Sequence, residues 1–255
     1  MDDPVQVSTD GPVRILRLHR PEARNAVDAR TARALREAWQ AFDADPETRA
    51  GILTGGEEAF CAGADLKDLE ALAAEVEGDN GPLGFTRLSV SKPTIAAIAG
   101  YCVAGGLELA CWCDLRIADE TAVFGCFERR FGVPLVDGGT QRLPRIVGLG
   151  RALEMILTGK PVTVVEALAM GLVNEAVPRG QALGRAVELA HAIAAFPQTA
   201  LRNDRQAVYE GIGLPLDEGL RVEARLGAGT MASGEAAAGV RAFREGKGRR
   251  GGAFE

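Results

Sequence analysis

The 255-residue sequence lacks several features that would assign it to common functional classes. It has only two histidines, His19 and His191, and neither lies in a segment that could reach an activated serine, which excludes a serine-protease-like site. No Gly-x-x-x-x-Gly-Lys-Ser/Thr is present, and no Gly-x-Gly-x-x-Gly follows a strand-like segment, so nucleotide-cradling loops of these types are not indicated. A net charge of −6 argues against a broad basic face for nucleic acid or an acidic membrane. Neither is therefore an expected partner, although a local basic patch could still bind a small anion.

Cysteine usage gives no sign of disulfides or of a metal site. The five cysteines are odd in number and form no repeated Cys-x-x-Cys pairs, which predicts free, buried thiols and a cytoplasmic location. Cys111-Trp-Cys113 is too tight to hold a metal alone, and no histidine follows nearby, so we expect no metal. The N-terminus lacks the basic and apolar regions of a signal peptide.

The apolar run at residues 94–112 is long enough to suggest a membrane span. Lys92-Pro93, the glycines at 100, 105 and 106, and Glu108 instead divide it into a strand, a turn and the start of a helix. Glu108 has apolar neighbours on both sides, and Glu128 ends the strand-like run 122–127. Apolar surroundings raise the pKa of a carboxyl group toward neutrality, so these two residues could form an acid/base pair.

Strands and helices alternate up to about residue 178, which predicts an α/β fold. Strands are expected at 5–7, 13–18, 51–55, 93–98, 115–118 and 122–127, and helices at 31–44, 65–74 and from about 105. Beyond 181 four segments have helical patterns: 181–195, 198–210, 216–228 and 233–246. We therefore divide the chain into a core at 1–195 and a helical region at 196–255 that packs on a neighbouring subunit. Residues 77–84 are predicted to form a flexible surface loop, and residues 246–255 to be loosely ordered.

Two turns share a pattern of small residues at the start of a helix. The first is Cys61-Ala-Gly-Ala-Asp-Leu-Lys, with Asp65 as a candidate N-cap, and the second is Ala104-Gly-Gly-Leu-Glu. Unpaired N–H groups at such positions can bind an anion or a developing oxyanion. The alternatives are a plain strand-to-helix turn at the first site and, for Glu108, a favourable charge in the first helical turn.

Five blocks together resemble the crotonase (enoyl-CoA hydratase/isomerase) superfamily, in order from about residue 5 to 250. They are Arg20-Pro-Glu-Ala-Arg-Asn-Ala, Phe60-Cys-Ala-Gly-Ala-Asp-Leu-Lys, Gly100-Tyr-Cys-Val-Ala-Gly-Gly-Leu-Glu-Leu-Ala, Cys113-Asp-Leu-Arg-Ile-Ala and Gly138-Gly-Thr-Gln-Arg-Leu. The resemblance implies a spiral of ββα units with a C-terminal helical trimerisation region, assembled as a homotrimer or a dimer of trimers. It also implies acyl-CoA thioester substrates and fatty acid metabolism. No cofactor is expected, because coenzyme A is part of the substrate.

The resemblance assigns roles to particular positions. The N–H groups of Ala64 and Gly105 would form the oxyanion hole for a thioester enolate. Glu108 and Glu128, at the hydratases' spacing of twenty residues, would hold the attacking water. For Arg24 the alternative is a solvated turn arginine. The residues expected to bind coenzyme A are Arg24, Ala26, Ala62, Gly63, Asp65, Leu66 and Lys67.

One segment departs from the hydratase pattern. Hydratases typically read Gly-x-x-Pro-Gly-Ala-Gly-Gly, whereas this chain has Gly132-Val-Pro-Leu-Val-Asp-Gly-Gly, with Val136 in place of a glycine whose N–H faces the water. Asp137 is expected to cap a helix at 138–147, and the alternative is a third acid in the pocket. The predicted function is hydration of 2-enoyl-CoA thioesters by a hydro-lyase. The alternatives are double-bond isomerisation and a catalytically silent acyl-CoA-binding protein.

Overall fold

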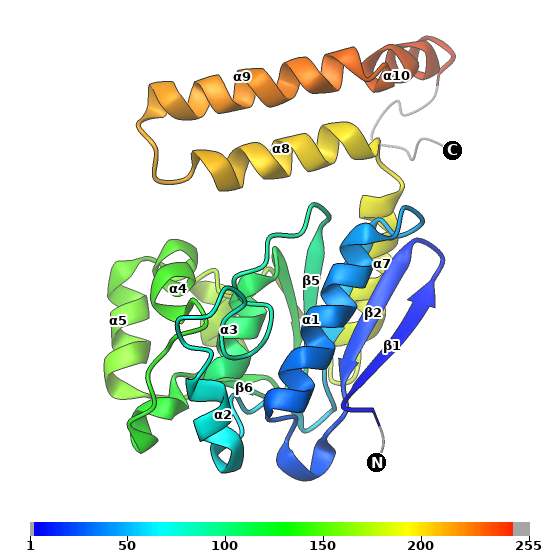
Figure 1. Cartoon of the computed structure of the whole chain (residues 1–255). Coiled ribbons are helices and arrows are strands. Elements are labelled where there is room, and N and C mark those ends of the chain that lie inside the picture. Colours follow the sequence, from blue (N-terminus) through cyan, green and yellow to red (C-terminus); the bar gives the residue numbers. More distant parts are fainter. Residues whose placement is uncertain (1–2, 247–255) are drawn as a thin grey trace.

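Two β-sheets form the body of the protein, and the chain passes repeatedly from one to the other (Figure 1). The computed structural model describes residues 3–246. The larger sheet contains β1 (Val5–Asp10), β2 (Val13–Leu18), β3 (Ala50–Thr54), β5 (Thr94–Ile98), β7 (Leu115–Asp119) and β10 (Glu175–Val177). It is parallel except for the hairpin of β1 and β2. The smaller sheet contains β4 (Ala59–Cys61), β6 (Tyr101–Val103), β8 (Val123–Gly125) and β9 (Val162–Thr163).

Successive turns of the chain place one strand in each sheet. β3 is followed by β4, β5 by β6 and β7 by β8, and α3 (Gly105–Trp112) starts directly after β6. This confirms the predicted α/β spiral of ββα units. It brings the ends of β4 and β6, where the two small-residue turns lie, next to each other in one sheet.

Helices cover the sheets and form the C-terminal part (Figure 1). Short 3₁₀ turns lie at η1 (Pro21–Ala23), η2 (Leu66–Asp68) and η3 (Phe127–Phe131). The other α-helices are α1 (Ala29–Ala44), α2 (Leu69–Ala73), α4 (Gly139–Val147), α5 (Leu149–Thr158), α6 (Val164–Ala169), α7 (Ala182–Ala194), α8 (Gln198–Gly211), α9 (Leu216–Ala232) and α10 (Glu235–Arg244).

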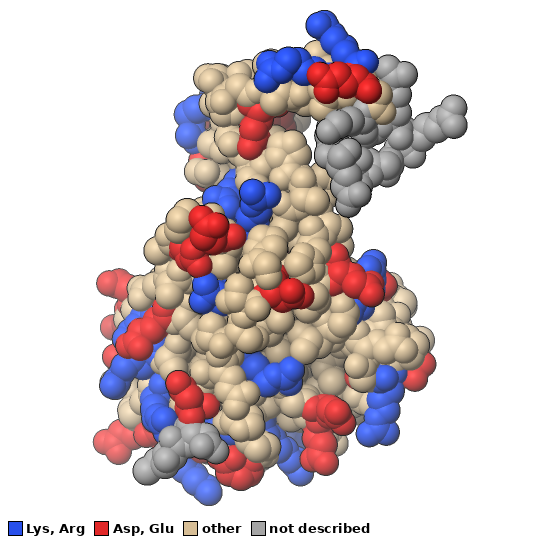
Figure 2. Space-filling view, turned by 90° about the vertical axis from the view of Figure 1, so that its right-hand side faces the viewer, with Lys and Arg blue, Asp and Glu red and all other residues tan. Residues whose placement is uncertain are grey.

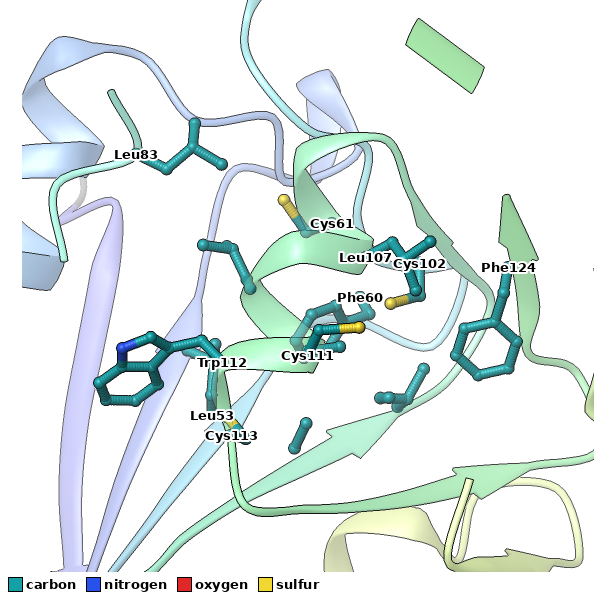
Figure 3. Close-up of a cluster of buried hydrophobic side chains, with 14 of the residues drawn as sticks. Leu53, Phe60, Cys61, Leu83, Cys102, Leu107, Cys111, Trp112, Cys113 and Phe124 are labelled. Carbon is teal, nitrogen blue, oxygen red and sulfur yellow. The ribbon is translucent and has the colours of Figure 1, made fainter. Parts of the chain in front are cut away.

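The central strands β3 and β5 are buried on both faces of the larger sheet, whereas the edge strand β1 is mostly exposed. Alternate side chains of a strand point to opposite faces, so they enter two different clusters. On one face, Ile52 and Ile95 pack with Ala186 of α7. On the other face, Leu53 belongs to a cluster that includes Trp39 of α1 and the side chains around α3. Figure 3 shows part of this second cluster, with α3 at its centre. The core therefore fixes α3, whose N-terminus carries one of the candidate oxyanion donors.

The long apolar run at 94–112 forms β5, β6 and α3, as the glycines and Glu108 predict. Within residues 3–246 no helix combines the length and apolar character needed to span a bilayer. All five cysteines are free and buried, which confirms the prediction, and four of them lie in or around α3 (Figure 3). Burial raises the pKa of the Cys61 thiol to about 12, so these thiols are core residues rather than nucleophiles.

The helices α8 to α10 stand apart from the two sheets (Figure 1). Asp114 links α8 to the body, since it accepts hydrogen bonds from Arg205 Nε at 2.9 Å and Tyr209 Oη at 2.6 Å. Acidic and basic side chains are interspersed over the face drawn in Figure 2. Many large apolar side chains of this helical part are exposed: Val208, Ile212, Leu214, Leu216, Leu220, Met231, Val240 and Phe243. The division at residue 195 and the role of these helices in assembly stay predictions, and residues 247–255 lie outside the described part of the chain.

Three local predictions were wrong in ways that matter for the site. Of the surface loop predicted at 77–84, residues 77–80 are exposed or half-exposed, whereas 81–84 are buried together with 85 and 86, and Leu83 is only 1% exposed. The helix expected at 65–74 is divided into η2 and the short α2. The strand expected at 122–127 ends at Gly125, so Glu128 lies in η3.

Candidate active site

A cavity of about 310 Å³ lies beside the N-terminus of α3. Three acidic residues line it, Glu108, Glu128 and Asp137, together with Ala64 and Gly105. Most of the remaining wall is apolar: Leu66, Leu69, Leu72, Val76, Pro82, Leu83, Phe127, Phe131, Val133, Pro134 and Val136. A concave, apolar site with a few converging polar groups is typical of a small-molecule pocket.

The N–H groups of Ala64 and Gly105 lie close together, as predicted from the two small-residue turns. Gly105 is the first residue of α3, so the helix supplies no acceptor for its N–H. Ala64 pairs with Val27 in a parallel β-bridge, in which the Val27 N–H donates to the Gly63 carbonyl and the Asp65 N–H donates to the Val27 carbonyl. The N–H of Ala64 takes no part in this bridge and points away from Val27. A Cβ built on Gly63 would lie 2.8 Å from the Gly105 nitrogen, and Gly63 has φ +97°. Gly63 therefore keeps the space in front of the two donors open.

The backbone just before α3 is strained. Ala104 has φ 52° and ψ −129°, a conformation that a residue with a Cβ rarely adopts and that costs about 1–3 kcal/mol. Its N–H donates to the Gly125 carbonyl at 2.9 Å, which holds the turn against β8. The tertiary structure thus fixes the direction in which the Gly105 N–H points.

Glu108 lies in the first turn of α3 and is 3% exposed. Its Oε1 accepts the N–H groups of Asp137 at 2.9 Å and Gly139 at 2.7 Å. Burial, and then the nearby Asp137 carboxylate, raise the pKa of Glu108 to about 8, while the two N–H donors act in the opposite direction. A Cβ on Gly139 would lie 2.9 Å from Oε1, so only glycine fits here without moving the carboxyl group.

Glu128 is buried on η3 across the same cavity. Within the described residues neither of its carboxyl oxygens has a hydrogen-bond partner. Arg129 Nη2 lies 3.9 Å from Oε1, too far for a hydrogen bond. Burial raises the pKa of Glu128, and its own backbone N–H and the charge of Arg129 oppose this shift. The two glutamates therefore differ, because the N–H groups of two other residues hydrogen-bond to Glu108, whereas no other residue in 3–246 hydrogen-bonds to Glu128.

The prediction that Asp137 caps the helix at 138–147 was wrong. The N-cap of α4 is Gly138, with φ 101°, and no side chain in the described part of the protein caps this helix. Asp137 is 4% exposed, and its Oδ1 accepts the Leu83 N–H at 3.0 Å and the Thr86 hydroxyl at 2.6 Å. The partners of this side chain are thus more than fifty positions away in the sequence, in the loop before β5. Its neighbour Val136 lines the cavity, as predicted.

The residues expected to bind coenzyme A form a continuous surface only in part. The segments at 24–26 and 62–66 are adjacent, since the Ala62 N–H donates to the Arg24 carbonyl at 3.1 Å. Arg24 is exposed, and its guanidinium lies 5.8 Å from the centre of the Tyr101 ring. Asp65 caps η2 and pairs with Arg20 at 2.9 Å, which gives it a structural role. Of these seven residues, Ala62 and Leu66 line the cavity, whereas Arg24, Ala26, Gly63, Asp65 and Lys67 do not.

Several residues that shape the site were not identified from the sequence. Leu83 lies against the oxyanion donors, because its Cδ1 would be 2.6 Å from a Cβ on Gly105. Arg142 Nη2 donates to the Thr86 carbonyl at 2.5 Å, and its Nη1 to the Asp137 carbonyl at 3.0 Å. The Gly138-Gly-Thr-Gln-Arg block could have pointed to Arg142, whereas nothing local marks Leu83 or Thr86.

Comparison with known proteins agrees with this geometry. The family model for enoyl-CoA hydratase/isomerase matches residues 9–250, and the chain belongs to this family. A probable enoyl-CoA hydratase of Rhizobium meliloti is 41% identical over 240 residues, which cover 93% of each protein. An (E)-benzylidenesuccinyl-CoA hydratase of Thauera aromatica is 37% identical, covering 85% of this chain and 86% of that protein. The crystal structure of enoyl-CoA hydratase EchA1 from Mycobacterium marinum superimposes with a TM-score of 0.91 at 36% identity, covering 96% of each chain.

Proposed function

We propose that this protein adds water across the 2,3 double bond of an enoyl-CoA thioester. The observation that carries the proposal is the placement of two buried glutamates, Glu108 and Glu128, in one cavity with the N–H groups of Ala64 and Gly105. The donors would polarise the thioester carbonyl and stabilise the enolate formed when oxygen adds at C3. Removing one such donor typically costs roughly 10²–10³ in rate.

The different surroundings of the two glutamates support different roles. Two N–H donors bind one oxygen of Glu108 and oppose the rise of its pKa to about 8, so an ionised fraction is present near neutral pH and its other oxygen can take a proton from water. Neither oxygen of Glu128 has a hydrogen-bond partner among the described residues, and burial raises its pKa, which favours the neutral form and a proton available for C2. Water would thus lose a proton to Glu108 as C3–O forms, and the enolate would take the proton of Glu128.

Double-bond isomerisation is the second candidate, and one observation favours it. Asp137 adds a third carboxyl group to the cavity, and Val136 stands where hydratases have a glycine. An isomerase would exclude water and move one proton between carbon atoms. A catalytically silent acyl-CoA-binding protein is less consistent with the site, because it has no need for two buried acids.

The partners, assembly and cellular location of the protein are also part of the proposal. We expect acyl-CoA to be the only organic partner in catalysis, without a further cofactor or metal. The exposed apolar side chains of α8 to α10 fit a homotrimer or a dimer of trimers. Five free, buried thiols suit a reducing compartment, which supports a cytoplasmic location.

An activity panel tests the proposed function. Purified protein is assayed with crotonyl-CoA, longer 2-enoyl-CoA, 3-enoyl-CoA and dienoyl-CoA, following the absorbance of the conjugated thioester. The proposal expects hydration of 2-enoyl-CoA and losses of about 10²-fold or more in Glu108→Gln and Glu128→Gln. Conversion of 3-enoyl-CoA or dienoyl-CoA without hydration would replace it by isomerisation, especially if the Glu128 variant stays active.

A further inference from the structure

The loop at 81–86 is held inside the protein by the side chain of Asp137. The Asp137 Oδ1 atom accepts both the Leu83 N–H and the Thr86 hydroxyl. Gly81 permits this close approach, since it has φ +77° and a Cβ on it would lie 2.9 Å from the same oxygen. The loop, Gly81-Pro-Leu-Gly-Phe-Thr, thereby contributes Pro82 and Leu83 to the wall of the cavity.

Two arginines hold the ends of the loop. Arg142 bridges the Thr86 and Asp137 carbonyls. Arg87, directly after the loop, donates to the Gly78 carbonyl and, through Nη2, to the Val76 carbonyl at 2.5 Å, which ties the chain after the loop to the chain before it. With its backbone fixed in this way, Leu83 presents its side chain to the cavity beside Gly105.

The backbone of Asp137 acts on the other side, at Glu108. Its N–H donates to Glu108 Oε1 at 2.9 Å. The Asp137 carboxylate also disfavours the ionised form of Glu108, since like charges in a buried site repel. One residue therefore contacts both the apolar wall and a proposed acid/base group.

We propose that Asp137 is a positioning residue that selects the acyl group through Leu83 and sets the protonation of Glu108 through its charge. The inference rests on the proposed function for the identity of the substrate. In this role Asp137 holds the loop through its Oδ1 atom and acts on Glu108 through its charge, and it exchanges no proton with the substrate.

The protonation of Glu108 at a given pH depends on every ionisable group that faces it. These groups are Asp137 and Glu128, which are acids, the Arg142 guanidinium, and the thiols of Cys111 and Cys126. Burial raises the pKa of both thiols above 9, so they stay neutral near pH 7. Among these groups, Asp137 is the acid whose N–H binds Glu108 and whose charge can be removed without changing its shape.

Three variants separate the two roles. Asp137→Asn keeps an oxygen that can accept from Leu83 and Thr86 but removes the charge. Thr86→Val removes one hydrogen bond to the loop and keeps the charge. Asp137→Ala removes both, so it should combine the effects of the other two.

Each variant is assayed for kcat/KM over pH with crotonyl-CoA and a longer 2-enoyl-CoA. In Asp137→Asn the ascending part of the pH profile of kcat/KM, which reports ionisation of Glu108, should move to lower pH by about 1 unit or more. The ratio of kcat/KM between the two substrates should stay the same. In Thr86→Val the ascending part of the profile should stay in place, and the ratio of kcat/KM between the two substrates should change about 2- to 10-fold, the scale of one buried hydrogen bond.

Opposite results would overturn the proposal. A folded Asp137→Asn protein that is inactive at every pH would make Asp137 a catalytic acid. An unchanged ratio of kcat/KM between the two substrates in both Thr86→Val and Asp137→Ala would show that the loop does not select the acyl group. An unchanged position of the ascending part of the pH profile in Asp137→Asn would show that Asp137 does not set the protonation of Glu108.

A measurement that needs no turnover keeps this test separate from the proposed function. The Glu108 carboxyl group, labelled with ¹³C and assigned by its absence in Glu108→Gln, is titrated by NMR in the wild-type and Asp137→Asn proteins. A lower pKa in Asp137→Asn supports the proposal even if no enoyl-CoA is hydrated, whereas equal values contradict it. Affinities for saturated acyl-CoA of two lengths test the loop in the same way.

Discussion

Replacing Glu108 by glutamine should remove most of the hydration activity and also make the folded protein more stable at alkaline pH. Glutamine keeps an oxygen that can accept the N–H groups of Asp137 and Gly139, but it has no charge to bury. Burial, together with the neighbouring Asp137 carboxylate, raises the pKa of Glu108 from 4.5 to about 8. At 1.36 kcal/mol per pH unit, this corresponds to ~5 kcal/mol as an upper value.

The sign of the effect follows from the direction of the pKa shift. Because the pKa is higher in the folded state, the folded protein binds more protons than the unfolded chain between pH 4.5 and about 8. The associated stability is complete below 4.5 and is lost as the pH rises through about 8. The Glu108→Gln protein does not lose it, so its advantage over wild type should be near zero at pH 4 and about 2–5 kcal/mol at pH 9.

Chemical denaturation at the two pH values measures this difference. Glu37→Gln, at an exposed position of α1, is the matched control for the loss of a carboxylate and should give nearly the same stability change at both pH values. A Glu108→Gln protein that is no more stable than wild type at pH 9 would refute the argument that burial of this charge is costly.

Three further predictions concern the geometry of the site and the assembly. Gly139→Ala should reduce hydration by about 10²-fold, the scale of one acid/base group, because its Cβ would displace the Glu108 carboxyl group. Gly150→Ala, near the start of α5, is the control and should keep full activity, because no described atom outside its own helical turn lies within 4 Å of the position that its Cβ would take. Gly105→Ala should weaken the binding of short acyl-CoA, because the added Cβ would push Leu83 into the cavity. Calorimetry measures this affinity, and an unchanged value would contradict the prediction. Sedimentation should find a trimer or hexamer at micromolar concentration, and a monomer would contradict the role given to α8–α10.

The sequence predicted the parts of the site that depend on local pattern. Small residues before α3 place the Gly105 N–H at a helix start, and an acid inside an apolar run marks Glu108. Both signals lie within a few residues of the group that they identify. The alternation of strands and helices likewise predicted an α/β body, since hydrophobic periodicity reflects which faces are buried, whereas the spiral of ββα units was implied only by the family resemblance.

Asp137 shows why the remainder could not be predicted in this way. Asp-Gly-Gly-Thr is typical of a helix start, and a helix does start there, but Gly138 takes the capping position with a positive φ that favours glycine. The Asp137 side chain can therefore bind Leu83 and Thr86 instead. The same contacts explain why residues 81–86 are buried although they directly follow the polar residues 77–80. Only the folded chain brings these residues together.

The most direct test of the central claim is to follow the atoms of water into the product. Crotonyl-CoA is incubated with the protein in deuterated, heavy-oxygen water, and the product is analysed by mass spectrometry and NMR. The proposed reaction predicts 3-hydroxybutyryl-CoA with heavy oxygen at C3 and one deuterium at C2, formed by the wild type and almost absent in Glu108→Gln and Glu128→Gln. Deuterium at carbon without heavy oxygen, or equal product from wild type and both variants, would contradict the claim that these two glutamates add water.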